Sequence, residues 1–154
     1  MSSIFAYLAI IGSAAFAGTM ICIGLAFGGW WTSLPPEDFL AWFAANSGFI
    51  ARTIPIVAGP AAIGLLGSLW LARRERSVRV VWALATVAMI SVGVVTGLYH
   101  LPTNAAFVAE TVPPVDVPET LATWRRLHAL RIALGLAAAG LALHATRTRV
   151  SVSE

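Results

Sequence analysis

The chain has 154 residues, of which 58% are hydrophobic and only 11% are charged. A soluble domain of this length would need many more polar side chains to cover its surface, so the composition excludes that class and indicates an integral membrane protein. The net charge of +3 comes from ten arginines and no lysine, against seven acidic residues. Because these arginines stand beside apolar segments, they indicate membrane topology, and we do not expect nucleic acid as a partner.

Four apolar segments are long enough to cross a bilayer, whose hydrocarbon core requires about 20 apolar helical residues. They cover approximately residues 4–31, 48–72, 78–99 and 118–144. Between the first two, the stretch from Leu34 to Phe43 begins with prolines and acids and ends with aromatic residues, which predicts a short helix at the membrane interface. We therefore expect an all-α, four-transmembrane-helix bundle, with a short interfacial helix after the first span, in a single membrane domain over residues 1–154.

Prolines and glycines mark expected features of these spans. We expect Pro55 and Pro60 to interrupt the second span and Pro102 to end the third, because proline removes a helical hydrogen bond and clashes with the preceding turn. Small residues at helix-contact spacing predict close packing between helices. The glycine pairs that show this spacing are Gly24 with Gly28, Gly93 with Gly97, and Gly135 near Gly140.

The arginines also predict the orientation. One group, Arg73, Arg74, Arg76 and Arg79, lies between the second and third spans, and Arg147 and Arg149 follow the fourth. Four crossings put both groups on the same side, which the positive-inside rule assigns to the cytoplasm. We therefore expect a protein of the cell (inner) membrane with cytoplasmic N and C termini and acidic outer connections. Arg125 and Arg126, near the outer end of the fourth span, argue in the opposite direction.

Trp124, His128 and Arg131 fall at i, i+4 and i+7, which places them on one face of the fourth span. Polar groups at this depth are costly and usually face a cavity, a partner or a substrate. In the competing interpretation, Trp124 lies at headgroup level and Arg131 extends outward to the interface. Arg131 lies deeper than Arg125 and Arg126, which already serve as interface anchors, and this favours a functional site.

A second polar group lies at the outer end of the third span, where Pro102 and Asn104 follow His100. His100 can approach His128 across the helix pair, although the sequence equally fits an interfacial residue that caps the span. Asn104 can either turn the chain or donate hydrogen bonds into a cavity. Arg52, near the outer end of the second span, is a further candidate for substrate binding or for a structural ion pair.

Two histidines could begin a haem or metal site, but other candidate ligands lie elsewhere. His144 is about 24 Å from His128 along one helix, and Cys22 has no ligand-like spacing to any other residue. These spacings disfavour a metal site, so a haem or metal protein is the less favoured alternative.

The order Pro102-x-Asn104 and then Trp124-x-x-x-His128-x-x-Arg131 resembles the anthrone oxygenase-like family of small four-span membrane proteins. Ala15-Phe16-Ala17-Gly18 and the stretch from Leu34 to Phe39 also resemble this family, so the likeness covers nearly the whole chain. The sequence departs from the family at Ala105, where many members have a second asparagine.

The resemblance implies an oxygenase that needs neither metal nor flavin and acts on a lipophilic aromatic of polyketide type. It implies catalytic roles for His128, Arg131 and Asn104. His128 can act as a general base, because the unperturbed pKa of histidine is about 6.5. Arg131 and Asn104 can stabilise negative charge that develops on the substrate.

Substrate binding is expected at Trp124, whose ring can stack on a planar aromatic, and at His100 and Arg52. The expected partners are a lipophilic small molecule, dioxygen and membrane lipid. The alternative is a non-catalytic membrane protein that uses the same residues to bind a lipid, a quinone or a protein partner. Association of copies of the chain into a homo-oligomer is left open.

Overall fold

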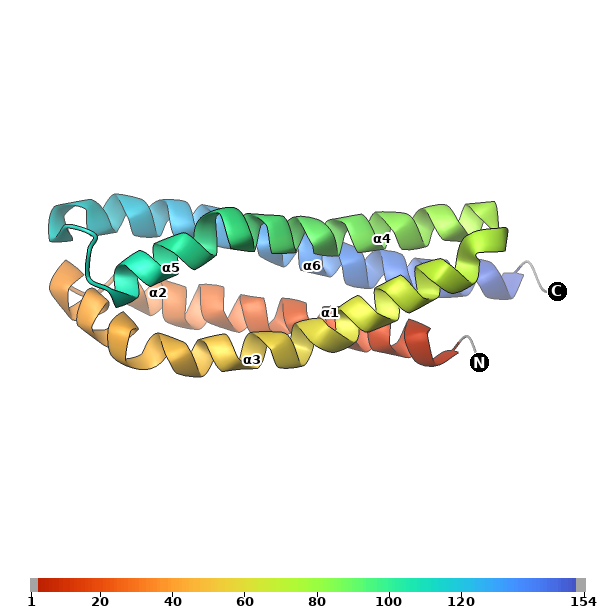
Figure 1. The fold of residues 1–154 in the computed structure, drawn as a ribbon, viewed down its shortest axis with the longest axis horizontal. Coiled ribbons are helices and arrows are strands. Elements are labelled where there is room, and N and C mark those ends of the chain that lie inside the picture. Colours follow the sequence, from red (N-terminus) through yellow and green to blue (C-terminus); the bar gives the residue numbers. More distant parts are fainter. Residues whose placement is uncertain (1–2, 152–154) are drawn as a thin grey trace.

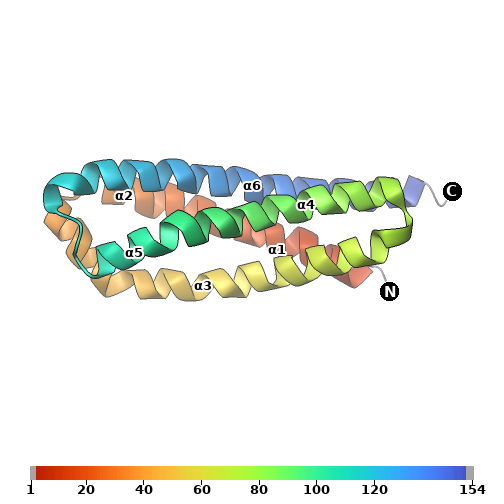
Figure 2. The ribbon, with the colours of Figure 1, turned by 45° about the horizontal axis from the view of Figure 1, so that its top comes forward.

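Four long helical rods run side by side along one axis and form a bundle (Figure 1). The structure, a computed structural model, describes residues 3–151, with side chains from residue 4 to residue 148. Both ends of the described chain lie at the same end of the bundle, as four antiparallel crossings require (Figures 1 and 2). Arg149 contributes to the expected orientation, but its side chain lies outside the described ones.

Each rod is built from consecutive helical elements. In chain order these are α1 (Ser3–Cys22), a π-helical turn (Ile23–Phe27) and α2 (Gly28–Trp31); α3 (Pro36–Leu71) and a 3-10 turn (Ala72–Arg74); α4 (Arg76–Val95), a π-helical turn (Thr96–His100) and α5 (Leu101–Val108); and a 3-10 turn (Pro114–Asp116) and α6 (Val117–Ser151). All four rods are long and apolar enough to cross a membrane. This confirms the predicted all-α class with four membrane-spanning candidates.

The second rod differs from its prediction, because the described residues show no separate interfacial helix. Instead, α3 begins at Pro36 and continues without a break to Leu71. Nothing after Phe43 ends the helix: the Asn46 side chain donates back to the carbonyl oxygen of Trp42 at 2.9 Å and stays within the helical path. Pro55 and Pro60 also lie inside α3, as is common for prolines in membrane helices.

The third rod continues past the proline expected to end it. A π-helical turn from Thr96 to His100 precedes α5, which holds Pro102 in its first turn. The wider π turn shifts the hydrogen-bond register ahead of the proline, so the chain changes direction without ending the helix. Figure 1 shows α5 inclined to α4 at this point. The turn brings His100 to the inside of the bundle, where its side chain is 1% exposed.

Close packing occurs at some of the expected glycines, such as Gly135, whose Cβ atom would lie 3.2 Å from the ring of Phe16 on α1, and at others that were not expected. A Cβ atom at Gly12 would collide with the backbone of Ala61, and one at Gly64 with the backbone of Ala9. These contacts bring α1 against α3, the most extensive helix pairing in the bundle. Gly93 and Gly97, by contrast, have open space at the Cβ position.

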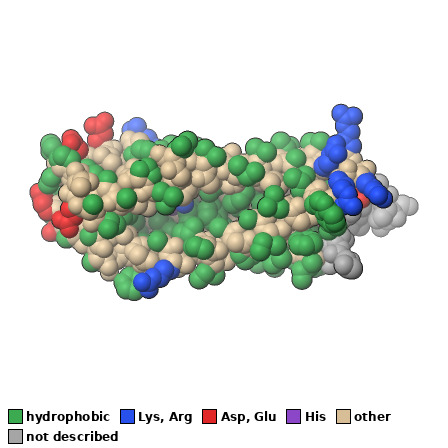
Figure 3. All heavy atoms as spheres, in the orientation of Figure 1, with side chains coloured by type: hydrophobic (Ala, Val, Ile, Leu, Met, Phe, Trp, Pro, Cys, Tyr) green, Lys and Arg blue, Asp and Glu red, His purple; other side chains and the backbone are tan. Residues whose placement is uncertain are grey.

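Acidic side chains gather at one end of the molecule, and a group of arginines gathers at the other (Figure 3). One end, called the acidic end, lies where α2 and α5 end and α6 begins (Figure 1). It carries Glu37, Asp38, Glu110, Asp116 and Glu119. The basic end lies near the termini and carries Arg73, Arg74, Arg76, Arg79 and Arg147. Apolar side chains cover the surface between them, which fits a protein whose middle lies in lipid.

Candidate active site

A cavity of about 260 Å³ lies in the half of the bundle nearer the acidic end. All four rods contribute to its wall, and the wall is mainly apolar. The lining residues are Met20, Ile23, Trp31, Phe43, Ser47, Ile50, Ala51, Ile54, Pro55, Thr96, His100, Leu101, Asn104, Trp124, His128 and Arg131. Figure 3 shows this face of the molecule recessed between the rod of α3 and the rod of α4 and α5.

His128 is held by α1, across the bundle from its own helix. Its Nε2 atom lies 2.7 Å from the carbonyl oxygen of Met20. A carbonyl only accepts hydrogen bonds, so Nε2 carries the proton and Nδ1 keeps a free lone pair. Nδ1 is buried and has no hydrogen-bond partner. The contact with Met20 therefore fixes the tautomer in which the other ring nitrogen can accept a proton.

Gly24 allows the imidazole of His128 to lie this close to α1. A Cβ atom at position 24 would be 2.9 Å from Cδ2 of His128 and 3.2 Å from Cδ1 of Ile132. These distances are shorter than ordinary van der Waals contacts, and His128 is only 2% exposed, so its ring has little room to move. The sequence predicted Gly24 as a helix-contact residue, and the contact it makes is with the candidate base.

Trp124 connects the polar residues to one another. Its ring stacks on His128 with a centroid distance of 4.7 Å and an interplanar angle of 8°. The Trp124 and His100 rings also meet in an edge-type contact, with 5.0 Å between their centroids. The indole Nε1 donates to Oδ1 of Asn104 at 2.8 Å, and because indole nitrogen only donates, this bond also fixes which way the Asn104 amide points. The amide nitrogen of Asn104 is thus left for other partners.

Arg131 is a buried cation, 5% exposed. One guanidinium nitrogen donates to the Met20 sulfur at 3.2 Å, but a thioether is a weak acceptor. Nε of Arg131 has no partner, and no carboxylate pairs with this guanidinium in the part of the chain that the structure describes. A buried charge without a counter-charge costs several kcal/mol. This cost is offset when an anionic ligand occupies the cavity.

The structure brings His100 to the same site as His128, with 6.0 Å between their ring centroids. Nδ1 of His100 lies 3.4 Å from the carbonyl oxygen of Val95, and Nε2 is buried without a partner. Most of the buried, unpaired side-chain polar atoms among the described residues belong to cavity-lining residues. These atoms are Trp31 Nε1, His100 Nε2, His128 Nδ1 and Arg131 Nε. Each buried polar atom left unpaired costs about 1–3 kcal/mol, so their convergence indicates a site for a polar ligand atom.

An aromatic cluster closes the acidic end of the cavity. Trp31 lies at its centre, with ring centroids 5.4 Å from Phe43, 5.9 Å from Phe39 and 5.6 Å from Trp124. Phe107 of α5 completes it, 5.0 Å from Phe39. All five side chains are buried. Water beyond these rings is thus separated from the cavity by a packed aromatic layer.

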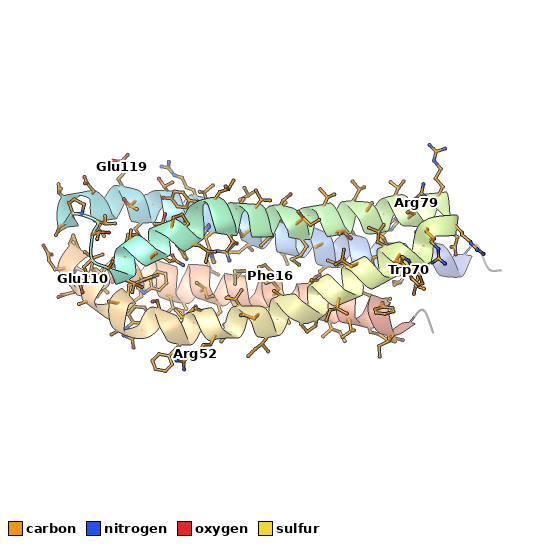
Figure 4. The ribbon with its side chains drawn as sticks, in the orientation of Figure 1. Phe16, Arg52, Trp70, Arg79, Glu110 and Glu119 are labelled. Carbon is orange, nitrogen blue, oxygen red and sulfur yellow. The ribbon has the colours of Figure 1, made fainter. Side chains whose placement is uncertain are left out.

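Arg52 is the one predicted site residue that does not line the cavity. Its side chain is exposed and points away from the bundle (Figure 4), with its guanidinium 5.7 Å from the ring centre of Phe49. It forms no ion pair among the described residues. His128, Arg131, Asn104, Trp124 and His100 all line the cavity.

The sequence does not assign Met20, Trp31 or Gly24 to the site, although it predicts Gly24 as a helix-contact residue. Met20 acts through a backbone carbonyl and a thioether, for which a single sequence carries no signal. Trp31 stands at the end of the first span, where a tryptophan is ordinarily an interface anchor. Its burial among Phe39, Phe43 and Trp124 depends on how the rods pack.

No group of three or more His, Cys, Asp or Glu side chains is placed to hold a metal ion within the described part of the chain. The site offers two imidazoles, a guanidinium, an amide and indole N–H groups. This set can accept a proton, donate hydrogen bonds and balance a negative charge.

The family model described as anthrone oxygenase matches residues 42–141, more than half of the chain. The matched segment contains His100, Asn104, Trp124, His128 and Arg131, and it begins after α1 and α2. No curated protein and no solved structure matches the chain.

Proposed function

We propose, because the chain belongs to the anthrone oxygenase family, that it oxidises a lipophilic polycyclic aromatic with dioxygen inside the membrane, without a cofactor. The observation that carries the proposal is the pairing of a buried proton acceptor with a buried cation. His128 Nδ1 and the Arg131 guanidinium both line the cavity, and neither finds a full partner in the protein. A substrate that loses a proton and becomes an enolate supplies what each group lacks.

The chemistry begins with proton removal. In an anthrone, the CH₂ group opposite the carbonyl is acidic, because the carbanion delocalises into an aromatic enolate. His128 Nδ1 accepts this proton, and the Met20 carbonyl stabilises the resulting imidazolium through Nε2. Arg131 and the amide nitrogen of Asn104 stabilise the enolate oxygen. Trp124, held by its ring contacts with both histidines, supports the planar ring system.

Oxidation follows from the electron-rich enolate itself. It gives one electron to dioxygen, and the resulting radical pair combines to form a C–O bond. The peroxide takes the proton from His128, and loss of water leaves a carbonyl at the former CH₂ carbon. The substrate CH₂ and one O₂ thus become C=O and one H₂O, and no other oxidant is consumed.

The dimensions and polarity of the cavity support a substrate of this kind. An apolar cavity of about 150 Å³ accommodates one benzene molecule, so a cavity of about 260 Å³ has room for a larger ring system. Apolar side chains such as Ile50, Ile54 and Phe43 form most of the wall. The aromatic cluster around Trp31 keeps water away, which protects the enolate from reprotonation by solvent.

We also propose the orientation in which both termini lie in the cytoplasm. The arginines of the basic end favour the cytoplasmic side by the positive-inside rule. The acidic end, with Glu110 and Glu119, then lies outside the cell membrane, and the cavity faces the outer half of the bilayer.

Oxygen uptake tests the proposal. Detergent-purified, chelator-treated protein is mixed with anthrone, and the rate is compared with that of spontaneous oxidation. We expect uptake above this background, and a loss of about 10²-fold or more in His128→Ala, the usual scale for a general base. His144→Ala is the matched control, because His144 is exposed on the same helix and far from the cavity.

A His128→Ala protein that folds and retains full activity would exclude the general-base role. If the wild-type protein binds the aromatic without accelerating uptake, the cavity is a binding site, and the non-catalytic alternative replaces the oxygenase.

A further inference from the structure

We infer that the cavity is filled from the hydrocarbon of the membrane, through an opening between α3 and α5, and that its substrate is therefore a molecule dissolved in the bilayer. The identity of this substrate as an oxidisable aromatic rests on the proposed function. The route rests on the residues at the opening, on their depth and on the closure of the other end.

The opening is marked by the lining residues that are also exposed. Ala51 and Pro55 on α3 and Leu101 on α5 line the cavity and reach the outer surface of the bundle. The remaining lining residues are buried or half-buried. All three residues at the opening are apolar, so a ligand that passes between them meets no charged or hydrogen-bonding group. A passage of this character admits lipophilic molecules and disfavours hydrated ones.

Exposed arginines at two levels along the axis of the bundle place the opening within the bilayer. Arg52 on α3 and Arg73 in the 3-10 turn that follows it lie about 30 Å apart at a rise of about 1.5 Å per residue, and so do Arg126 and Arg147 on α6. This spacing equals the thickness of a typical hydrocarbon core, about 30 Å. Figure 3 shows basic side chains at an intermediate level of the long axis as well as at the basic end. The two levels thus mark the two boundaries of the hydrocarbon.

The opening lies at and just inside the boundary nearer the acidic end. Ala51 precedes Arg52, and Pro55 lies about one helical turn deeper. This is the depth at which planar aromatics with a polar oxygen collect, because the rings favour hydrocarbon and the oxygen favours the headgroups. Arg131 and the histidines are reached directly from this level.

A route from water through the aromatic cluster at the acidic end is closed. The cluster of Trp31, Phe39, Phe43 and Phe107 fills the space between the cavity and the connecting segments, and each of these side chains is no more than 3% exposed. A large aromatic substrate cannot pass without separating these rings. The side between α3 and α5 needs no comparable rearrangement, because the lining residues Ala51, Pro55 and Leu101 are already exposed there.

Stopped-flow binding in proteoliposomes, without oxygen, tests the route. The probe is 1-hydroxyanthraquinone, and the readout is the rate of the saturable part of tryptophan quenching, since Trp31 and Trp124 line the cavity. Ala51→Phe narrows the opening and should slow association about tenfold, equivalent to about 1.4 kcal/mol in the barrier. Leu101→Ala widens it and should speed association. The matched control is Ala62→Phe, an exposed position on the same face of α3 that does not line the cavity.

The outcomes separate this inference from the proposed function. Saturable binding whose rate is the same in the wild type, Ala51→Phe and Leu101→Ala would overturn the lateral route and leave the oxygenase proposal standing. Rates that follow the opening, in a protein that fails the oxygen-uptake test, would support the route and overturn catalysis. A wild-type protein without saturable binding would overturn the inference, because the cavity would not be the site.

Discussion

His128 shows how a single residue acquires a chemical role from atoms that its own helix does not supply. A backbone carbonyl on α1 fixes one ring nitrogen, Trp124 stacks on the ring face, and Nδ1 remains available. The helical spacing of Trp124, His128 and Arg131 predicted their common face correctly. The Met20 carbonyl that selects the tautomer was beyond prediction, because every residue has a carbonyl and only tertiary packing determines which one is free.

Replacing Gly24 by alanine tests how tightly this position is held. The added methyl group would lie 2.9 Å from Cδ2 of His128, so the ring must shift or lose its hydrogen bond to Met20. We expect activity in the oxygen-uptake assay to fall about tenfold or more, as small displacements of catalytic groups commonly cause. The bundle should still fold, which circular dichroism in detergent can check.

Gly18→Ala is the matched control in the same helix. A Cβ atom at Gly18 meets nothing within 4 Å, and alanine favours a helix over glycine by up to about 1 kcal/mol. Gly18→Ala should therefore keep its activity and unfold at the same or a higher temperature. Equal activity in Gly24→Ala and Gly18→Ala would show that the ring of His128 does not need its present position.

At the scale of the elements, the helices were more predictable than their ends. Apolar runs of sufficient length predicted the four rods, because lipid requires every backbone group to be paired within a helix. The extension of α3 back to Pro36, and the passage of the third rod through Pro102, were predicted wrongly. Proline breaks an isolated helix, but a π turn with supporting neighbours accommodates it.

The end of α5 gives a stability prediction at this scale. Glu110 has a φ of 52°, the left-handed conformation. Its amide donates to the carbonyl of Phe107 at 3.1 Å, and the amide of Thr111 donates to that of Ala106 at 3.0 Å. This is the Schellman pattern, in which glycine normally occupies the left-handed position. Glu110→Gly should therefore stabilise the protein by about 0.5–1 kcal/mol, measured as a higher unfolding temperature in detergent.

Glu119→Gly provides the opposite control for the same substitution. Glu119 lies in the first turn of α6, where a negative charge favours the helix dipole and glycine weakens the helix. This variant should unfold at a lower temperature. A destabilising effect of Glu110→Gly would contradict the left-handed conformation assigned to the end of α5.

At the scale of the whole molecule, charge and shape combine into one arrangement. The bundle is longer than a hydrocarbon core is thick, since α3 alone has 36 residues and extends about 54 Å. The excess length lies on the acidic side, where aromatic rings pack over the cavity, while the basic end stops at the other boundary. The site therefore lies near the boundary of the hydrocarbon, beneath a packed layer of aromatic side chains. This position suits a lipophilic substrate and an intermediate that reacts with water.

The orientation of this arrangement is open to direct measurement. Single-cysteine variants are made in a Cys22→Ala background, with Glu110→Cys at the acidic end and Arg79→Cys at the basic end, which Figure 4 shows at opposite ends of the bundle. Both positions are exposed. If the positive-inside rule governs insertion, a membrane-impermeant maleimide added to spheroplasts should label Glu110→Cys at once and Arg79→Cys only after the membrane is permeabilised. The reverse pattern would place the cavity in the cytoplasmic leaflet, where its substrate would be drawn from molecules made inside the cell.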